Sequence, residues 1–252
     1  MKLCPVTNLV RATEESSQGR FYEPVRGVSF DFGDTIVALD ERLLLQKLER
    51  EGLSADLARL EAALPSARSA YNAAIADGAV NHPWKPFMRA LLEHAGTQPA
   101  SELERVVEAL WLDQPRNNLW RKLLPGMPEL CRELKMAGVP IGILTNSEGR
   151  AHMLAEELGL ATLFETLIDS GVFGVAKPDA RIFEAFAMDM HLPAAAIVHV
   201  GDSLRADVLG ALGAGMQAIW FAGREEQAPP GVAVCEDSEA LRAEFVRRGL
   251  LR

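Results

Sequence analysis

Short apolar runs along the chain alternate with amphipathic stretches, and this alternation predicts strands that are joined by helices. Runs with the length and composition of buried strands occur at residues 27–32, 139–146, 164–170, 195–203 and 216–223. Stretches with apolar residues at steps of three and four, which are typical of amphipathic helices, occur at residues 127–138, 149–160 and 178–190. The pattern predicts an α/β fold with a doubly wound parallel sheet, whose ligand sites lie at the carboxyl ends of the strands.

One long segment interrupts this alternation. Between residues 39 and 122 no run is typical of a strand, but amphipathic helices are predicted at residues 41–53, 55–76, 85–96 and 101–112. We therefore expect an all-helical cap domain at 39–122, inserted into an α/β core domain made of 25–38 and 123–252. Both connections lie close to strand ends, so the insertion can cover a site there. Residues 1–24 lack periodicity and predict a flexible N-terminal extension.

Composition narrows the range of partners. The chain has 252 residues, of which 48% are hydrophobic, enough for a large buried core. It carries 26 basic and 35 acidic residues, for a net charge of -9 and a pI near 5.2. Such an acidic chain is a poor candidate for broad contact with nucleic acid or an anionic membrane. A small-molecule substrate is expected instead, and an anionic substrate would need local positive charge.

The cysteines and the N-terminal residues indicate the compartment. Cys4, Cys131 and Cys235 lie far apart and have neither zinc-site spacing nor the density of a disulfide framework. The N-terminus lacks the apolar core of a secretory signal, and no later run reaches about 18 uninterrupted apolar residues. We expect a soluble cytoplasmic protein with no membrane partner, which is a monomer or a homodimer.

Polar residues follow the predicted strands at the points where the strands end. In chain order these are Asp31, Thr145, Asn146, Lys177, Asp202 and Asp207. Because the carboxyl ends of parallel strands share one edge of a sheet, we expect these side chains to converge. Three carboxylates beside one lysine are costly unless a cation balances their charge.

Magnesium is the cation that this set of side chains favours, because it takes one or two carboxylates, waters and a substrate phosphate. Asp31 and Asp202 are the expected direct ligands. Asp207 lies in the first turn of a helix that Ser203 can cap, and it is better placed to hold a metal-bound water or to orient Lys177 than to bind the metal directly.

The sequence resembles the haloacid dehalogenase superfamily of hydrolases, in particular its members with a helical cap inserted after the first motif. The four family motifs occur in order as "FDFGDTI", "ILTN", "AKPDARIF" and "VGDSLRAD", and with the cap they cover nearly the whole chain from residue 27. The resemblance implies a Rossmann-like core and a hydrolase, most simply a magnesium-dependent phosphatase of a small phosphorylated metabolite.

The same resemblance implies the roles of the strand-end residues. Asp31 is the nucleophile, which forms an aspartyl-phosphate that water then cleaves. Thr145 and Asn146 hydrogen-bond the transferred group, and Lys177 holds its negative charge and positions the nucleophile. Magnesium binds the phosphate, the two direct ligands named above and the main-chain carbonyl of Gly33.

One position departs from the family pattern. Phosphatases of the family have a second aspartate two residues after the nucleophile, which protonates the leaving group and then deprotonates water, but this chain has Gly33 there. Positioned acid and base chemistry is worth about a hundredfold to ten-thousandfold in rate. Asp34, one residue later, is a tentative substitute for the missing acid, and a cap residue is the alternative. The metal loses nothing, because glycine still offers its carbonyl.

The departure leaves other hydrolases open. A dehalogenase-like enzyme expels halide without an acid at this position, but that group works without metal and lacks the acidic fourth motif that "GDSLRAD" preserves. A phosphonatase-like enzyme keeps magnesium and a small residue here, but it needs a Schiff-base lysine in the cap, for which Lys47, Lys85 and Lys122 are available. The third alternative is a catalytically degenerate binding protein of the same fold, which the intact strand-end residues argue against.

The predicted helical insertion supplies candidates for a substrate pocket. Trp84, Phe87, Trp111 and Trp120 can line one, although helical spacing favours the interior of the insertion for them. The cations that can reach over the site are Arg42, Lys47, Lys85, Arg89 and Lys122, although such charges usually mark the solvated face of a helix. His199 lies inside an apolar strand and is expected to be packed in the core.

Overall fold

The structure, a computed structural model, describes residues 23–77 and 83–252. The flexible extension predicted at 1–24 therefore falls outside the described residues, except for its last two. Of these, Glu23 is tied to the sheet, because its main-chain carbonyl accepts a hydrogen bond from Gln217 Nε2 at 2.8 Å. Among the described residues, no helix has both the length and the apolar character that a membrane crossing requires.

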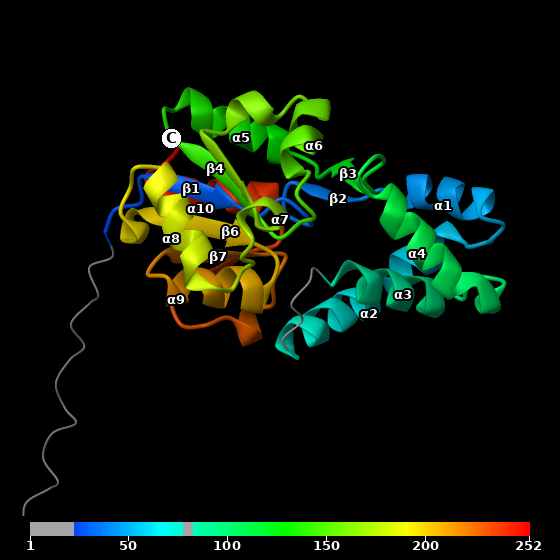
Figure 1. Ribbon diagram of the computed structural model, residues 1–252. Helices are drawn as coiled ribbons and strands as arrows, with labels where there is room; N and C mark the ends of the chain where they lie inside the picture. The colour runs from blue at the N-terminus through cyan, green and yellow to red at the C-terminus, as the bar shows by residue number, and fades with distance from the viewer. Residues whose placement is uncertain (1–22, 78–82) are drawn as a thin grey trace, which may run out of the picture.

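A six-stranded sheet forms the centre of the fold (Figure 1). Its strands lie in the order β5-β4-β1-β6-β7-β8, and every neighbouring pair is parallel. The strand bounds are β1 Gly27–Phe30, β4 Ile141–Thr145, β5 Thr166–Asp169, β6 Ile197–Gly201, β7 Gln217–Phe221 and β8 Ala233–Cys235. The predicted α/β fold with a parallel sheet is confirmed, with β8 as a strand that the sequence pattern did not predict.

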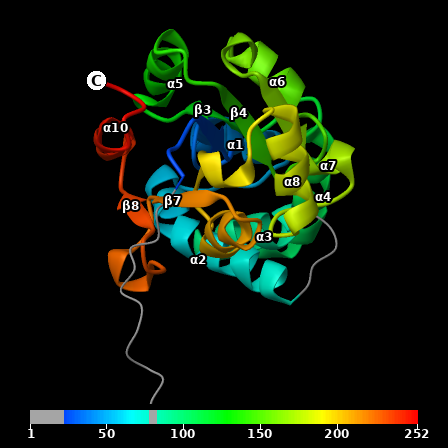
Figure 2. The same ribbon diagram turned by 90° about the vertical axis from the view of Figure 1, so that its left-hand side faces the viewer.

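Helices cover both faces of this sheet (Figure 2). Side chains alternate along each strand, so that Val198 and Val200 of β6 pack with α5, α6 and α10, whereas Ile197 packs with α8 and α9. The helix bounds are α5 Met127–Met136, α6 Ala151–Glu157, α7 Ser170–Phe173, α8 Ala180–Asp189, the π-helical segment η4 Leu204–Leu209, α9 Gly210–Gly213 and α10 Ser238–Arg247. Because both faces are covered, the central strands β1, β4 and β6 are buried along their whole length and are mostly apolar, and this made them visible in the sequence.

The second part of the structure is a helical unit with an apolar core of its own. Its helices are α1 Glu41–Arg50, α2 Leu57–Ala76, α3 Trp84–His94 and α4 Leu103–Asp113, which agree with the helices predicted from periodicity. Leu48, Leu60 and Leu91 are fully buried among them. Figure 1 shows this unit beside the carboxyl edge of the sheet, with α2 and α3 packed against each other.

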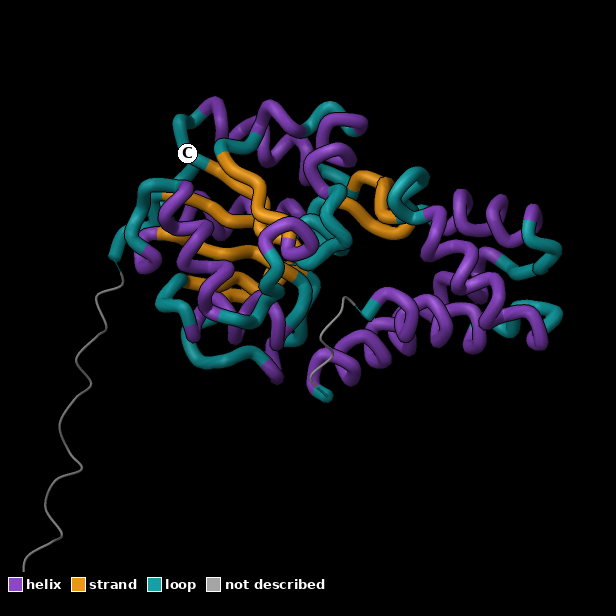
Figure 3. The backbone as a smooth tube through the Cα atoms, viewed as in Figure 1, coloured by secondary structure: helices purple, strands orange, loops and turns teal. Residues whose placement is uncertain are grey.

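A two-stranded antiparallel ribbon joins the helical unit to the rest of the chain (Figure 3). It consists of β2 Val37–Leu39 and β3 Trp120–Leu123, with Val37 opposite Leu123. The expectation of no strand between residues 39 and 122 is therefore wrong at both ends of that segment. The strands are short, and β3 is partly exposed, so neither produces an apolar pattern; each is stabilised by a partner about eighty positions away in the sequence.

Candidate active site

Lys177 lies at the centre of a buried polar cluster at the carboxyl edge of the sheet. Its Nζ donates hydrogen bonds to Asp31 Oδ1 at 2.8 Å, to Asp207 Oδ1 at 2.6 Å and to the main-chain carbonyl of Leu144 at 2.7 Å. These acceptors use all the donors of the ammonium group. Lys177 is thus held in one orientation, with the carboxylate of Asp31 fixed against it.

The strand ends bring the other carboxylates to the same place. Asp31 follows β1, and its main-chain N–H donates to Val200 O at 2.8 Å, next to the end of β6. Asp202 follows β6, and its main-chain carbonyl accepts a hydrogen bond from Trp220 Nε1 at 2.7 Å. Carboxylate oxygens of Asp31, Asp202 and Asp207 lie within 4.8 Å of one another. The convergence expected from a parallel sheet is therefore present in the structure.

Asp207 has both of its carboxylate oxygens engaged by the protein. Its Oδ1 accepts from Lys177 and from His199 Nε2 at 3.1 Å, and its Oδ2 accepts from the main-chain N–H of Ser203 at 2.9 Å. The predicted cap is formed as well, because the Ser203 hydroxyl accepts from Ala206 N–H. This arrangement favours the role of orienting Lys177 over direct metal binding for Asp207.

His199 is buried, as its place in an apolar strand predicted, and it also supports the cluster. Its Nδ1 lies 2.8 Å from Ser29 Oγ, and burial lowers the pKa of the ring, so a neutral imidazole donates to Asp207 through Nε2. Gly201 allows Asp207 to come this close. A Cβ added at Gly201 would stand 2.3 Å from Asp207 Cγ, which no side chain can tolerate.

The charges in this cluster are unevenly balanced. Burial raises the pKa of Asp31 to about 6, against the opposing effect of Lys177. Burial also raises the pKa of Asp202 well above its usual range, and the neighbouring Asp34, Asp207 and Asp31 add to the effect. Lys177 and His199 hold the pKa of Asp207 low despite its burial.

This set of groups fits a divalent cation. Crowded carboxylates with raised pKa values are stabilised as anions by a nearby positive charge, and Lys177 has no donor left for Asp202. Asp31 and Asp202 supply hard oxygen ligands of the kind that magnesium prefers. Gly33, which the sequence predicted to add a main-chain carbonyl, lines the same pocket.

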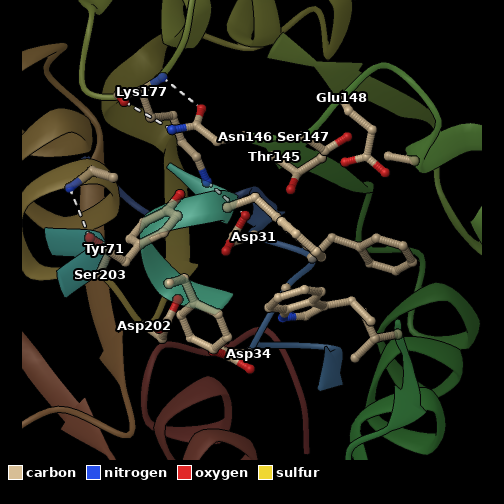
Figure 4. Close-up of a pocket in the computed structure, with 18 of the residues that line it drawn as sticks. Asp31, Asp34, Tyr71, Thr145, Asn146, Ser147, Glu148, Lys177, Asp202 and Ser203 are labelled. Atoms are coloured by element: carbon tan, nitrogen blue, oxygen red, sulfur yellow. Dashed lines mark hydrogen bonds and ion pairs between the residues drawn. The ribbon is translucent and has the colours of Figure 1, made fainter. Parts of the chain in front are cut away.

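Thr145 and Asn146 lie next to this cluster at the end of β4. Thr145 is buried and lines the pocket beside Asp31 (Figure 4). Asn146 also lines the pocket, and its side chain holds the main chain of Lys177, since its Oδ1 accepts from Lys177 N–H at 2.8 Å and its Nδ2 donates to Lys177 O at 3.0 Å. Its hydrogen bond to the transferred group stays a prediction.

The helical unit completes a pocket over the cluster. From this unit, the connection that follows it and β3 come Arg68, Tyr71, Asn72, Trp84, Phe87, Gln114, Asn118 and Trp120. Three of the four aromatic residues proposed from sequence thus line the pocket. The fourth, Trp111, instead packs against Trp84 with 5.5 Å between the ring centroids.

The cation that reaches the pocket from the helical unit is Arg68, which the sequence analysis missed. Among the described residues, the lining includes none of the five cations that were proposed from sequence. Arg68, Tyr71 and Asn72 lie at steps of three and four along α2, so they share one face of the helix. That spacing was a visible signal, but only the packing of α2 against α3 reveals which face is turned to the site.

Asp34 also lines the pocket, with a partner from the helical unit. Its Oδ2 accepts a hydrogen bond from Arg68 Nε at 3.2 Å, so this ion pair links the first motif to α2. Asp34 has a φ of 54°, in the left-handed region. Aspartate tolerates that conformation better than most residues do. The carboxylate is therefore in the pocket, as a substitute acid would need to be, and it is bound to a cation there.

A second polar link joins the two parts of the structure at Glu148. Asn118 Nδ2 donates to Glu148 Oε1 at 3.1 Å, and burial raises the pKa of this carboxyl group. Asp169 fixes the loop that carries Glu148, because it accepts from Ser147 Oγ at 2.6 Å and from Ala151 N at 2.9 Å. Glu148 is thus a rigidly mounted carboxylate in the pocket wall (Figure 4).

Comparison with known proteins identifies the family to which this site belongs. A family model described as haloacid dehalogenase-like hydrolase matches residues 25–215, which is most of the chain and includes every strand-end residue discussed above. The chain belongs to the haloacid dehalogenase-like hydrolase family. It is therefore a hydrolase, as the four motifs implied.

Several known proteins match this chain over most of their length. Haloacid dehalogenase-like hydrolase domain-containing protein 3 from Bos taurus is 27% identical over 215 residues, which are 81% of this chain and 85% of the relative. The 5-amino-6-(5-phospho-D-ribitylamino)uracil phosphatase YigB from Escherichia coli is 28% identical over 219 residues, which are 80% of this chain and 87% of YigB. The solved structure of the hydrolase YfnB from Bacillus subtilis, bound to magnesium, matches this structure with a TM-score of 0.66 at 22% sequence identity. The match covers 88% of this chain and 99% of YfnB, and it supports the fold.

Proposed function

We propose that this haloacid dehalogenase-like hydrolase is a magnesium-dependent phosphatase of a small phosphorylated metabolite, with Asp31 as its nucleophile. The observation that carries the proposal is the contact of Lys177 with both Asp31 and Asp207, beside Asp202 and at the floor of a pocket. A fixed carboxylate next to a buried cation suits attack on an anionic phosphate. The phosphatase among the relatives compared above supports the same reaction class.

The reaction has two steps at the carboxylate of Asp31. First, an oxygen of Asp31 attacks phosphorus, the ester P–O bond breaks, and the leaving alkoxide takes up a proton. Second, water attacks the same phosphorus, the bond to Asp31 breaks, and inorganic phosphate leaves. Lys177 is charged in the resting site, because Asp207 and Asp31 raise its pKa against the effect of burial. Thr145, which lines the pocket beside Asp31, is the expected hydrogen-bond donor to the transferred group.

Magnesium held by Asp31 and Asp202, with the main-chain carbonyl of Gly33, would offset the charge of the phosphate and favour attack by an anionic nucleophile. Asp207 and Asn146 act on the protein side, where they orient Lys177 through its ammonium group and its main chain.

Protonation of the leaving group lacks an obvious donor, because Gly33 stands where the family's phosphatases have an aspartate. Asp34 remains the expected substitute, because it lies in the pocket one residue away. Its Oδ2 already accepts a hydrogen bond from Arg68 Nε, so one of its two carboxylate oxygens is occupied. We therefore expect slow turnover of alkyl phosphates and faster turnover of esters with good leaving groups.

Substitution of Asp34 by asparagine tests this assignment. Asp34→Asn should lower kcat for an alkyl phosphate about tenfold or more, with little change for p-nitrophenyl phosphate, since that leaving group needs no proton. Equal kcat values for wild type and variant on the alkyl phosphate would reject Asp34 as the acid.

The phosphonatase-like alternative finds little support in the positions of the lysines. Lys47 donates to Asp113 at 2.7 Å, Lys85 pairs with Glu108 at 2.5 Å, and Lys122 pairs with Glu41 at 3.0 Å. These are structural ion pairs, and in the described part of the chain the pocket lining includes none of these lysines. Absence of a borohydride-trapped adduct with phosphonoacetaldehyde is the expected result.

A panel of phosphate esters, assayed with and without magnesium, tests the proposed function as a whole. We expect phosphate release that requires magnesium and that falls at least about a thousandfold in Asp31→Asn, because the nucleophile is lost. Magnesium-independent release, or release that persists in Asp31→Asn, would contradict the proposal. Inactivity across the panel would favour a binding protein of the same fold.

A further inference from the structure

Glu148 is a carboxylate of the pocket lining whose printed partner is a neutral group. Its Oε1 accepts a hydrogen bond from Asn118 Nδ2 at 3.1 Å, and no ion pair with Glu148 is formed among residues 23–77 and 83–252. Burial raises the pKa of this carboxyl group, Asp169 adds to the effect, and Arg150 offsets it only in part. A positive charge brought by a ligand would stabilise the carboxylate.

Neighbouring residues hold the Glu148 carboxylate in one place. Asn118 Oδ1 accepts from Gln114 Nε2 at 3.0 Å and from the main-chain N–H of Trp120 at 2.7 Å, so the amide turns its Nδ2 toward Glu148. The loop of Glu148 packs closely against Gly171, where an added Cβ would stand 2.6 Å from the Glu148 main-chain carbon. The carboxylate is therefore preorganised to meet a group of the ligand.

The pocket as a whole has more negative than positive charge. Five carboxylates and two cations line it among the described residues. Lys177 pairs with two of the carboxylates, Arg68 pairs with a third, and Asp202 is an expected ligand of magnesium. A magnesium ion and a phosphate dianion would bring opposite charges of equal size, so the negative excess would stay. Such a pocket attracts a positive leaving group and repels a negative one.

An aromatic ring close to Glu148 adds to this preference. Trp120 lines the pocket and is half-buried, and its main-chain N–H and the Glu148 carboxylate are bound to the same Asn118 side chain. The face of an indole ring attracts a cation such as an ammonium group, whereas a hydroxyl group has no net charge to be attracted. The carboxylate and the ring together therefore favour an amine over an alcohol.

We propose that the leaving group of the substrate carries a positively charged amine that pairs with the Glu148 carboxylate. The substrate is then a phosphorylated amino alcohol without a carboxylate, such as an aminoalkyl phosphate or an amino sugar phosphate. A phosphorylated amino acid is disfavoured, because its carboxylate would add to the negative excess and Arg68 is already paired with Asp34. This inference rests on the proposed phosphatase function and adds the charge of the leaving group.

Competition with p-nitrophenyl phosphate tests the inference, because it measures binding even of alkyl phosphates that turn over slowly. The competitors are aminoalkyl phosphates and hydroxyalkyl phosphates of matched chain lengths, with magnesium present. We expect the inhibition constant of the best amine to be at least about tenfold lower than that of the alcohol of the same length.

The outcomes of this competition separate the inference from the proposed function. Equal inhibition constants at every chain length, with clear hydrolysis of p-nitrophenyl phosphate, would overturn the amine and leave the phosphatase function intact. Absence of hydrolysis of p-nitrophenyl phosphate by the magnesium-loaded protein would overturn the proposed function and this inference with it.

Two matched variants test the pairing with Glu148. Glu148→Gln removes the charge and keeps a side-chain oxygen that can accept from Asn118, and it should lower the preference for the amine about tenfold, to near parity. Glu157→Gln is the control, since it removes an equal charge from an exposed residue of α6 outside the pocket lining of the described residues. A preference retained in Glu148→Gln, or lost equally in both variants, would contradict the pairing.

The exclusion of a carboxylate is tested on the unmodified protein. O-phosphoethanolamine and O-phosphoserine both carry the amine and differ by one carboxylate. We expect the inhibition constant of O-phosphoserine to be at least about threefold higher. Equal or tighter binding of O-phosphoserine would overturn the substrate class. Because neither this comparison nor that of amines with alcohols needs a variant, both decide the matter even if Glu148→Gln does not fold.

Discussion

Gly33 is the residue at which this chain departs from the phosphatases that its motifs resemble. The backbone there does not demand a glycine, because a Cβ added at Gly33 would lie 3.5 Å from Trp120 Cδ1 and 3.7 Å from Trp120 Nε1, at ordinary contact distances. A side chain would therefore fit at position 33, and packing does not explain why a glycine stands there in place of the acid. The nearest neighbour of that Cβ is Trp120, which lines the same pocket.

Substitution of Gly33 by aspartate should restore the missing acid. We expect Gly33→Asp to raise kcat for an alkyl phosphate such as glycerol 3-phosphate about tenfold to a hundredfold, because a positioned carboxyl group can protonate the alkoxide. Steady-state phosphate release measures the change. Gly33→Asn is the matched control, of nearly the same size but unable to give up a proton, and an equal gain in both variants would refute the explanation.

At the residue scale, the sequence predicted those site residues whose positions depend on the sheet alone. Asp31, Lys177 and Asp202 follow strands whose apolar runs are clear, and parallel strands bring their ends together. Arg68 and Glu148 escaped prediction, because their place in the pocket depends on how the helical unit meets the sheet. For Asn146 the sequence did not show the additional hydrogen bonds to the main chain of Lys177, because they depend on a loop geometry that residue types do not specify.

At the element scale, the close approach of η4 to the end of β6 holds the charged cluster in place. Ser203 caps the N-terminus of this segment, Asp207 lies within it, and Gly201 provides the space in which the Asp207 carboxylate sits. Through Asp207, this segment thus holds the ammonium group of Lys177 next to the end of β6. A side chain at Gly201 would push Asp207 and Lys177 apart.

This dependence predicts a large effect of a single methyl group. Gly201→Ala should lower the free energy of unfolding by about 1–3 kcal/mol, because the new Cβ overlaps Asp207 and the backbone must shift. Urea unfolding followed by circular dichroism measures it. Gly213→Ala, in α9 with nothing within 4 Å of an added Cβ, should leave stability unchanged or raise it by up to about 1 kcal/mol. Equal effects of the two substitutions would contradict the packing argument.

The sequence predicted the strands that are buried on both faces of the sheet. It did not predict the short strands that are stabilised mainly by hydrogen bonds to a partner strand. The five strands predicted from apolar runs were identified, as were the helices α1 to α4 that the structure describes in the helical unit. The ribbon of β2 and β3 and the edge strand β8 are three or four residues long and partly exposed. Such strands form because a partner strand is present, and a single sequence holds no local sign of that partner.

At the scale of the whole molecule, one pocket depends on two separately packed parts. The ends of the strands supply the reacting groups, and the helical unit supplies the aromatic residues Trp84 and Phe87 of the pocket lining. In the described part of the chain, the polar links between these parts at the pocket include Arg68 with Asp34 and Asn118 with Glu148. The Arg68–Asp34 ion pair is partly exposed, so it contributes little to stability and acts mainly on the geometry of the pocket.

The buried thiols report on the folding of the sheet part as a whole. Burial raises the pKa of Cys131 to about 12 and that of Cys235 to about 11, so at pH 8 both are protonated in the folded protein. In a Cys4→Ser variant we expect almost no reaction with a thiol reagent at pH 8 until the chain is unfolded in urea, where the pKa values return to about 8.5. Fast modification in native buffer would contradict the packing of α5 and β8 described above.

The central claim is that Asp31 carries the phosphoryl group during turnover. Mixing the magnesium-loaded protein with a phosphate ester and quenching with borohydride should reduce an aspartyl-phosphate to homoserine, which peptide mass spectrometry can locate. We predict homoserine at residue 31, only when both ester and magnesium are present, and at no other aspartate. Turnover of the ester without any modification at Asp31, or with modification at a different carboxylate, would contradict the account.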